Sequence, residues 1–177
     1  MNRRQFFAKS SQVITVTTLP FTLSSCEDTT NLVEMMTSKL QLIFENSESV
    51  TSLGTWTPSE ILQHCENSIA YAITEYPRQK SAFIKHTIGK AAFHVFDGLG
   101  AMKHSLTEKI PGEADFKALE IKTACSRLVS ALDQLSEQNK NMEHFFFGSL
   151  SPIEMSRAQY LHIQNHLEDI VINRNLS

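Results

Sequence analysis

The sequence predicts an all-α protein, an antiparallel four-helix bundle with an additional short helix. Two observations predict this class: apolar residues recur every three or four positions through most of the chain after Cys26, and the alternation of a half-buried strand is rare. The length of 177 residues and the hydrophobic content of 41% are typical of one globular domain. Long helical segments joined by modest loops then favour a bundle.

The first two helices are expected at about residues 30–46 and from Thr57 onward. The second has a clear N-terminal signature, because Thr57 suits the N-cap, Pro58 suits the first helical position and Glu60 completes a capping box. Pro77 ends this helix, since proline cannot continue the hydrogen-bond ladder.

Three further helices are expected at about residues 81–99, 116–138 and 151–173. Glycines mark the end of the first of these, and the second shows the most regular apolar face. The third opens with the same combination of capping serine, early proline and glutamate that opens the helix at Thr57. The connections 102–115 and 139–151 are expected to be loops.

The first 25 residues are expected to be an export signal. Arg3 and Arg4 precede a chargeless stretch that is too short and too rich in threonine to span a membrane. The segment around the two arginines resembles a twin-arginine signal, and Leu23-Ser24-Ser25-Cys26 resembles a bacterial lipobox. The alternatives are an ordinary positively charged leader and, for Cys26, a free thiol beside a plain cleavage site.

A lipid on Cys26 would divide the chain into three parts. Residues 1–25 would be the signal peptide, 26–31 the lipidated cysteine with its spacer, and 32–177 the helical bundle. The mature protein is then expected outside the cytoplasm of a bacterial cell, periplasmic or facing outward, and tethered to a membrane.

Charge and cysteine content exclude several classes of function. With 16 Lys+Arg against 19 Asp+Glu and a pI of about 6.2, the chain lacks the positive field that nucleic-acid binding requires. Its three cysteines have no paired spacing, which excludes a disulfide framework and a thiolate zinc ribbon. Cys65 and Cys125 are expected to be small core residues.

The spacing of the histidines predicts a metal site. His162 and His166 lie one helical turn apart, so both rings project from one face of the last helix. His64 is the best third candidate, because it lies among apolar residues of the second helix, where an imidazole without a partner is costly to bury. Three imidazoles would hold a divalent ion and leave a fourth position open. Zinc, nickel, iron and manganese all accept such ligands, so the element stays open.

The remaining histidines have no partner at helical spacing. His86 and His94 are expected on the surface or beside a site, whereas His104 and His144 are candidates for the pocket or for a position behind the metal ligands. A purely structural place for His144 stays equally open.

Four segments, taken in chain order, resemble the DinB/YfiT-type superfamily and, more narrowly, its exported branch of domains of unknown function. The resemblance extends over about residues 32–170. The segments are Trp56-Thr57-Pro58-Ser59-Glu60-Ile61-Leu62-Gln63-His64, then Met102-Lys103-His104 with Ile110-Pro111-Gly112, then His144-Phe145-Phe146-Phe147-Gly148-Ser149-Leu150-Ser151, and Tyr160-Leu161-His162-Ile163-Gln164-Asn165-His166-Leu167.

This resemblance implies an antiparallel four-helix bundle in which His64, His162 and His166 converge on a divalent metal. It also implies chemistry of the kind that better-known members perform, which includes transfer to low-molecular-weight thiols such as bacillithiol or mycothiol. The narrow branch has no assigned reaction, so the resemblance supplies no substrate.

Two functions of different class therefore stay open. The first is a metal-dependent hydrolase or thiol transferase acting on an unknown small molecule. The second is a non-catalytic, membrane-tethered binding or structural protein whose histidines only stabilise the bundle. A homodimer formed through an exposed helix face is compatible with either. A pocket beside the three histidines would favour the first function, and a packed, dry triad would favour the second.

Overall fold

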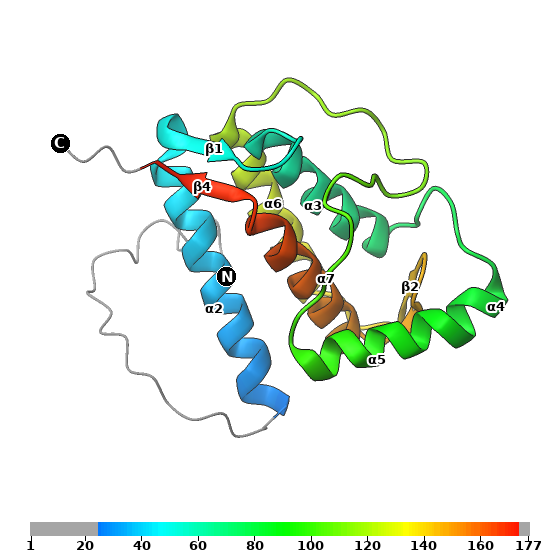
Figure 1. Ribbon diagram of the computed structural model, residues 1–177. Coiled ribbons are helices and arrows are strands. Elements are labelled where there is room, and N and C mark those ends of the chain that lie inside the picture. Colours follow the sequence, from blue (N-terminus) through cyan, green and yellow to red (C-terminus); the bar gives the residue numbers. More distant parts are fainter. Residues whose placement is uncertain (1–24, 174–177) are drawn as a thin grey trace.

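The computed structural model of the chain describes residues 25–173, with side chains from Met35 onward. Figure 1 shows the helices in chain order, with two short strand pairs at the edges. In chain order the elements are α2 (Ser25–Glu45), η1 (Ser47–Ser49), β1 (Val50–Ser52), α3 (Pro58–Ile73), α4 (Ala82–Ile84), η2 (Lys85–Gly89), α5 (Lys90–Leu99), α6 (Ile121–Ser136), β2 (Met142–His144), β3 (Gly148–Leu150), α7 (Pro152–Leu167) and β4 (Ile170–Ile172).

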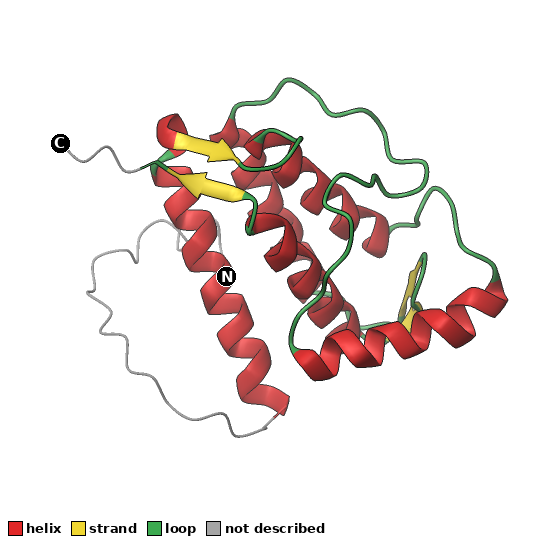
Figure 2. Ribbon diagram, viewed as in Figure 1, coloured by secondary structure: helices red, strands yellow, loops and turns green. Residues whose placement is uncertain are grey.

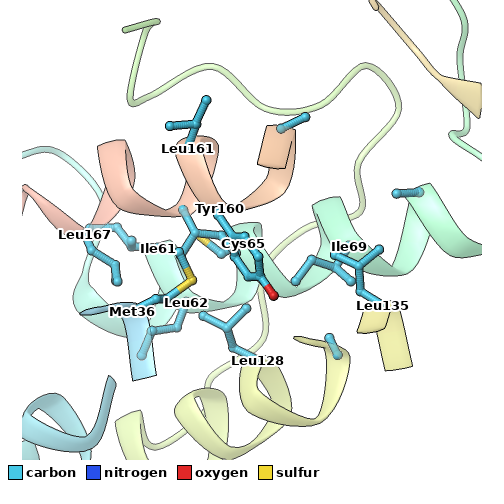
Figure 3. Packing of buried hydrophobic residues seen from close by; sticks show 14 of the residues in the cluster. Met36, Ile61, Leu62, Cys65, Ile69, Leu128, Leu135, Tyr160, Leu161 and Leu167 are labelled. Atoms are coloured by element: carbon cyan, nitrogen blue, oxygen red, sulfur yellow. The ribbon is translucent and has the colours of Figure 1, made fainter. Parts of the chain in front are cut away.

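The core lies between α2, α3, α6 and α7. Helix α3 packs against both α6 and α7, and α2 also contacts α6 and α7. Figure 3 shows apolar side chains from these four helices meeting around Cys65 of α3. Cys65 and Cys125 are free thiols buried in this core, as expected from the sequence. Burial raises the pKa of both thiols, to about 12 for Cys125.

Capping boxes begin the two helices that carry the candidate metal ligands. At α3 the Thr57 amide donates to the Glu60 carboxylate at 2.7 Å, and the Glu60 amide donates back to the threonine hydroxyl. Ser151 and Glu154 form the same reciprocal pair at the start of α7. Each box satisfies backbone donors that would otherwise lack a partner at a helix start. Both predicted helix starts are confirmed.

The prediction of an all-α four-helix bundle is wrong, because the fold is mixed α/β. Strands β1 and β4 pair antiparallel with Val50 opposite Ile172, and β2 and β3 form an antiparallel hairpin with Met142 opposite Leu150 (Figure 2). Each of these strands has only three residues. Alternation over three residues leaves too little pattern to be recognised against helical periodicity, which explains the error.

Three expected helices are also shorter than the sequence suggested. Helix α3 ends at Ile73, four residues before Pro77. The last helix ends at Leu167 rather than near residue 173, and the β-branched run Ile170–Ile172 pairs as a strand instead. Helix α6 begins at Ile121 because the preceding segment is held by a side chain. Gln63 accepts from the Lys117 amide at 2.9 Å and donates to the Lys117 carbonyl at 3.0 Å.

The segment 82–99 is helical throughout, as predicted, but contains a π-helical turn at its centre. The elements α4, η2 and α5 follow one another without a break and form the long helix at the lower edge of Figure 1. Gly89 closes the π-helical turn, and the β2–β3 hairpin lies directly on it. A Cβ at Gly89 would stand 1.9 Å from the Phe146 carbonyl oxygen, so only glycine permits this approach.

The long connection between α5 and α6 crosses in front of α3 and α7 (Figure 1). It places the otherwise distant His104 and Glu113 beside those helices. The predicted loop at 102–115 is thus confirmed as a segment without helix, and it contributes to the site.

Residues 1–24 of the predicted export signal, Arg3 and Arg4 included, lie outside the described residues. Cys26 falls within α2, but its side chain is not among those described. Over residues 25–173, none of the helices combines the length and the apolar character that crossing a membrane requires.

Candidate metal centre

His64, His162 and His166 meet between α3 and α7. One ring nitrogen from each lies within 4.8 Å of the corresponding nitrogen of the other two. His64 and His166 are fully buried, and His162 is partly buried. The structure therefore brings together the three residues that the sequence singled out, in a cluster that could hold a metal ion.

The spacing of the ring nitrogens has the scale of a metal coordination shell. The Nε2 atoms of His64 and His162 are 3.2 Å apart. Two nitrogens bound to one tetrahedral zinc at about 2.0–2.1 Å are separated by roughly 3.3 Å. The two helices thus hold these nitrogens at the separation that a shared ion requires.

Glu113 fixes the orientation and the tautomer of His64. Its carboxylate accepts from His64 Nδ1 at 2.9 Å, from the Ile110 amide at 3.1 Å and from Asn67 Nδ2 at 2.9 Å. Because carboxylate oxygens accept hydrogen bonds, His64 carries its proton on Nδ1 and presents a bare Nε2 in the neutral ring. A carboxylate behind a histidine in this way is a common feature of metal sites.

The turn that carries Glu113 is specified locally. Gly112 has a φ of +87°, a left-handed conformation that favours glycine. A Cβ there would also lie 2.8 Å from Cβ of Pro77, just beyond α3. The turn therefore sits against the end of α3, and the Glu113 side chain is 0% exposed. Sequence reasoning identified the turn but missed this residue, which lies 49 positions from His64 along the chain.

His104 adds a fourth imidazole to the cluster. Its Nε2 is 3.1 Å from Nε2 of His166, and its ring centroid is 4.9 Å from that of His162. The Asn165 side chain accepts from the His104 backbone amide at 3.3 Å, which ties the loop to α7. His104 therefore stands close enough to share an ion with His166.

Burial keeps the imidazoles of His162 and His166 neutral. It lowers the pKa of His166 to about 2 and the pKa of His162 well below its ordinary value, and the neighbouring His64 lowers both further. Burial also lowers the pKa of His104, although less of that residue is enclosed. The Nδ1 atoms of His162 and His166 are buried with no hydrogen-bond partner among the described residues. Neutral imidazoles are the form that binds metal.

Trp56 covers the cluster on one side. Its ring is stacked on His166 with 8° between the planes, and its centroid lies 4.9 Å from that of His64. It is the one tryptophan of the sequence. Its fluorescence therefore reports on the site alone.

A cavity of about 400 Å³ adjoins the cluster. His64, His104 and His162 form one part of its wall. Most of the remaining wall is apolar, and it includes Met102, Phe96 and the aromatic run Phe145-Phe146-Phe147. Such a combination of apolar walls and a few polar groups is typical of a small-molecule site.

His144 lies in the cavity wall and takes no part in the cluster. It is 7% exposed, and its Nδ1 accepts from the Phe146 and Phe147 backbone amides at 3.2 and 3.1 Å. Burial lowers the pKa of His144 to about 3. His86 and His94 are exposed on the helix 82–99.

The chain was compared with known proteins and families. The family described as protein of unknown function (DUF1569) matches it over residues 28–173. Neither a curated protein nor a solved structure matches significantly. The matched family is not the DinB/YfiT superfamily, so the resemblance drawn from the four segments is wrong, together with the bundle it implied. The thiol-transfer chemistry loses this support and stays a prediction. The segments that suggested it, HxxxH above all, are short and recur in unrelated helices.

Proposed function

The chain belongs to DUF1569, a family of proteins of unknown function, and we propose that it is a metal-dependent enzyme acting on a small molecule. His64, His162 and His166 would hold a divalent ion, and the substrate would enter the adjoining cavity. The single observation that carries this proposal is the position of the cluster, because two of its three histidines also line the cavity. A buried metal-sized cluster without such a space would need no catalytic explanation.

The residues present fit a divalent ion. His64 presents a bare Nε2 because its Nδ1–H group donates a hydrogen bond to Glu113. Neutral His162 and His166 complete a set of nitrogen donors that suits zinc and other late transition metals. An ion bound there would polarise a substrate oxygen or lower the pKa of a water towards about 7, which supports hydrolysis.

The chain's own residues supply the rest of the site. Glu113 holds the His64 ring in one orientation, and Trp56 excludes water from one side of the cluster. The phenylalanine run makes part of the cavity wall apolar, which strengthens electrostatic interactions inside the cavity.

A second function is favoured by the position of His104. With its Nε2 3.1 Å from that of His166, His104 can complete a set of four ligands. Four protein ligands close a zinc site, and closed sites are structural. In this alternative the ion only stabilises the fold, and the cavity has no part in chemistry.

Metal analysis of the purified protein tests the proposal. We expect about one equivalent of a transition metal after reloading, and its loss in His162→Ala. His86→Ala is the matched control, because His86 is an exposed histidine of the same fold. If neither the wild type nor the control retains metal, the proposal fails.

His104→Ala separates the two functions. If the ion has three protein ligands and a catalytic role, this variant keeps its metal. If His104 is the fourth ligand of a structural site, the variant loses much of its affinity for the metal. Cobalt absorption spectra of both proteins, recorded with and without added azide, show whether a coordination position is open. An unchanged wild-type spectrum would favour the structural function.

Export and lipid attachment at Cys26 are proposals that rest on the sequence alone. Mass spectrometry of the protein recovered from membranes of a bacterial host would detect a diacylglycerol on Cys26. The Cys26→Ser variant should lose that mass and leave the membrane fraction. The same lipid-free protein from both variants would exclude the lipobox.

A further inference from the structure

His144, a histidine outside the metal cluster, also lines the cavity. His144 ends strand β2, lies in the cavity wall and is 7% exposed. His144 and His162 line the same cavity from β2 and α7. Nothing in the metal site requires His144, because its ring is not part of the cluster.

The hairpin determines which nitrogen of His144 carries the proton. Nδ1 accepts from two backbone amides, those of Phe146 and Phe147, at 3.2 and 3.1 Å. A ring nitrogen that accepts hydrogen bonds carries no proton, so the neutral ring must be protonated on Nε2. Among residues 25–173 no acceptor is found for this Nε2–H group. The Nε2 atom is not among the buried atoms that lack a partner, so it is accessible, and a ligand in the cavity that His144 lines can accept from it.

The ring is held rigidly in this orientation. It stacks on Phe147 with centroids 4.4 Å apart and 17° between the planes, and Tyr76 packs edge-on at 5.1 Å. Tyr76 is itself fixed, since Gln159 donates to its hydroxyl at 3.1 Å. The close approach at Gly89 locks the hairpin against the long helix. His144 therefore offers a preorganised donor.

The rest of the cavity wall indicates what kind of molecule this donor would meet. Aromatic side chains suit a flat apolar body, and 400 Å³ is near the lower end of the range for small-molecule sites. Lys80 and Lys109 contribute positive charge at the wall, against one lining acid, Glu108. Lys109 is paired with Asp115 at 2.9 Å, whereas the Lys80 ammonium has no acid within bonding distance among the described residues. The polar groups thus favour an oxygen-bearing ligand.

We propose that the cavity takes a small carboxylate or carbonyl compound with a flat apolar body, and that His144 donates its Nε2–H to the ligand's oxygen. This inference rests on the proposed function for the role of the metal, but the hydrogen bond itself does not require metal. His144 is a ligand-binding residue that also positions the oxygen near the histidine cluster.

Two substitutions separate the binding role of His144 from its structural role. His144→Asn places an amide oxygen near the position of Nδ1, where it accepts from the hairpin amides, but cannot reach the position of Nε2. His144→Gln places an NH₂ donor near Nε2 at the expense of the hairpin acceptor. His144→Asn should therefore keep more of the stability and lose ligand binding, whereas His144→Gln should keep ligand binding and lose more of the stability.

The probes are benzoate and benzylamine, which share a ring and differ in the polar group. Calorimetry and Trp56 fluorescence measure their binding to zinc-loaded and zinc-free protein. We expect benzoate to bind more tightly than benzylamine, and His144→Asn to weaken benzoate binding about tenfold, the loss of one hydrogen bond to a charged acceptor. His144→Gln should bind benzoate to within about threefold of the wild type while being less stable than His144→Asn.

Several outcomes would overturn the inference. They are no benzoate binding to the wild type, equal binding of the two probes, or undiminished benzoate binding in His144→Asn. Binding that follows thermal stability across the two variants would show a structural role only. Metal content measured in the same samples keeps the two proposals apart, because zinc-free protein still tests the His144 donor and a metal-free wild type defeats only the proposed function.

Discussion

The ring nitrogens of His144 and those of the histidine cluster have opposite kinds of surroundings. His144 turns Nδ1 toward two backbone amides, so the fold itself satisfies the ring's acceptor. In the cluster, by contrast, ring nitrogens face other ring nitrogens at 3.1 and 3.2 Å, and the Nδ1 atoms of His162 and His166 have no partner among the described residues. Neutral imidazoles crowded in this way gain little from one another. Nδ1 of His144 therefore belongs to the fold's own hydrogen bonding and Nε2 is left for a ligand, whereas the cluster is arranged for a cation.

Of the changes considered, metal removal should lower the stability of the native protein most. An ion bound about a thousandfold above its dissociation constant stabilises the native state by about 4 kcal/mol, which corresponds to a melting temperature higher by roughly 10 °C. Chelation should abolish this increment in the wild type and have no effect in His162→Ala. Calorimetric scans with and without chelator measure it, with His86→Ala as the control. An equal melting temperature for the metal-free and the metal-loaded wild type would show that the histidine cluster binds no stabilising ion.

Displacing the hairpin should disturb His144 and spare the cluster. In Gly89→Ala the new Cβ would stand 1.9 Å from the Phe146 carbonyl oxygen, so the backbone has to move, at a cost of about 2 kcal/mol or more. Gly98→Ala is the matched control, because that Cβ meets nothing within 4 Å and alanine favours the helix by about 0.5–1 kcal/mol. Urea unfolding of both variants gives the comparison. Equal stabilities would mean that the hairpin does not press on the helix.

Loosening His64 should weaken the metal site without touching the hairpin. Glu113→Gln replaces the carboxylate behind His64 by an amide, and loss of such a partner lowers metal affinity about 10- to 100-fold. The control is Glu108→Gln, an exposed acid on the same connection. Competition with a fluorescent zinc chelator measures both affinities. An affinity unchanged in Glu113→Gln would show that the carboxylate does not orient the ring.

The smallest expected effect is the loss of stability at acidic pH, which should be greater in the wild type than in His144→Asn. The pKa of His144 lies at about 3 in the native protein, below its ordinary value of 6.5, so the unfolded chain binds the extra proton first. The stabilisation is complete above about pH 6.5 and is lost as the pH falls from there towards 3, by roughly 1 kcal/mol over the first unit below 6.5. Unfolding of metal-free protein at pH 7 and pH 5 should show a steeper loss for the wild type. Parallel losses would contradict the buried neutral state.

Local sequence signals were enough to locate the helices and the three histidines. The two capping boxes specify where α3 and α7 begin, and helical spacing fixes His162 and His166 on one face. Burial of His64 was predictable from its apolar neighbours. These features depend on residues within a few positions of one another, which is why sequence alone reveals them.

The remaining features depend on contacts between distant positions. Glu113 meets His64 across 49 residues, and β1 pairs with a strand at the other end of the described chain. A three-residue strand and a single glutamate after a turn carry no pattern of their own. His104 was placed near the site by the sequence, but its 3.1 Å approach to His166 depends on the path of the whole connection. The family prediction was wrong, because it rested on short segments, whereas the DUF1569 match extends over residues 28–173.

An anomalous difference map from crystals soaked in zinc would locate an ion bound by the three histidines. We expect one strong peak between ring nitrogens of His64, His162 and His166, with nitrogen distances of about 2.0–2.1 Å, and no peak at His144. A peak located elsewhere, or these three imidazoles without density between them in fully soaked crystals, would contradict this expectation.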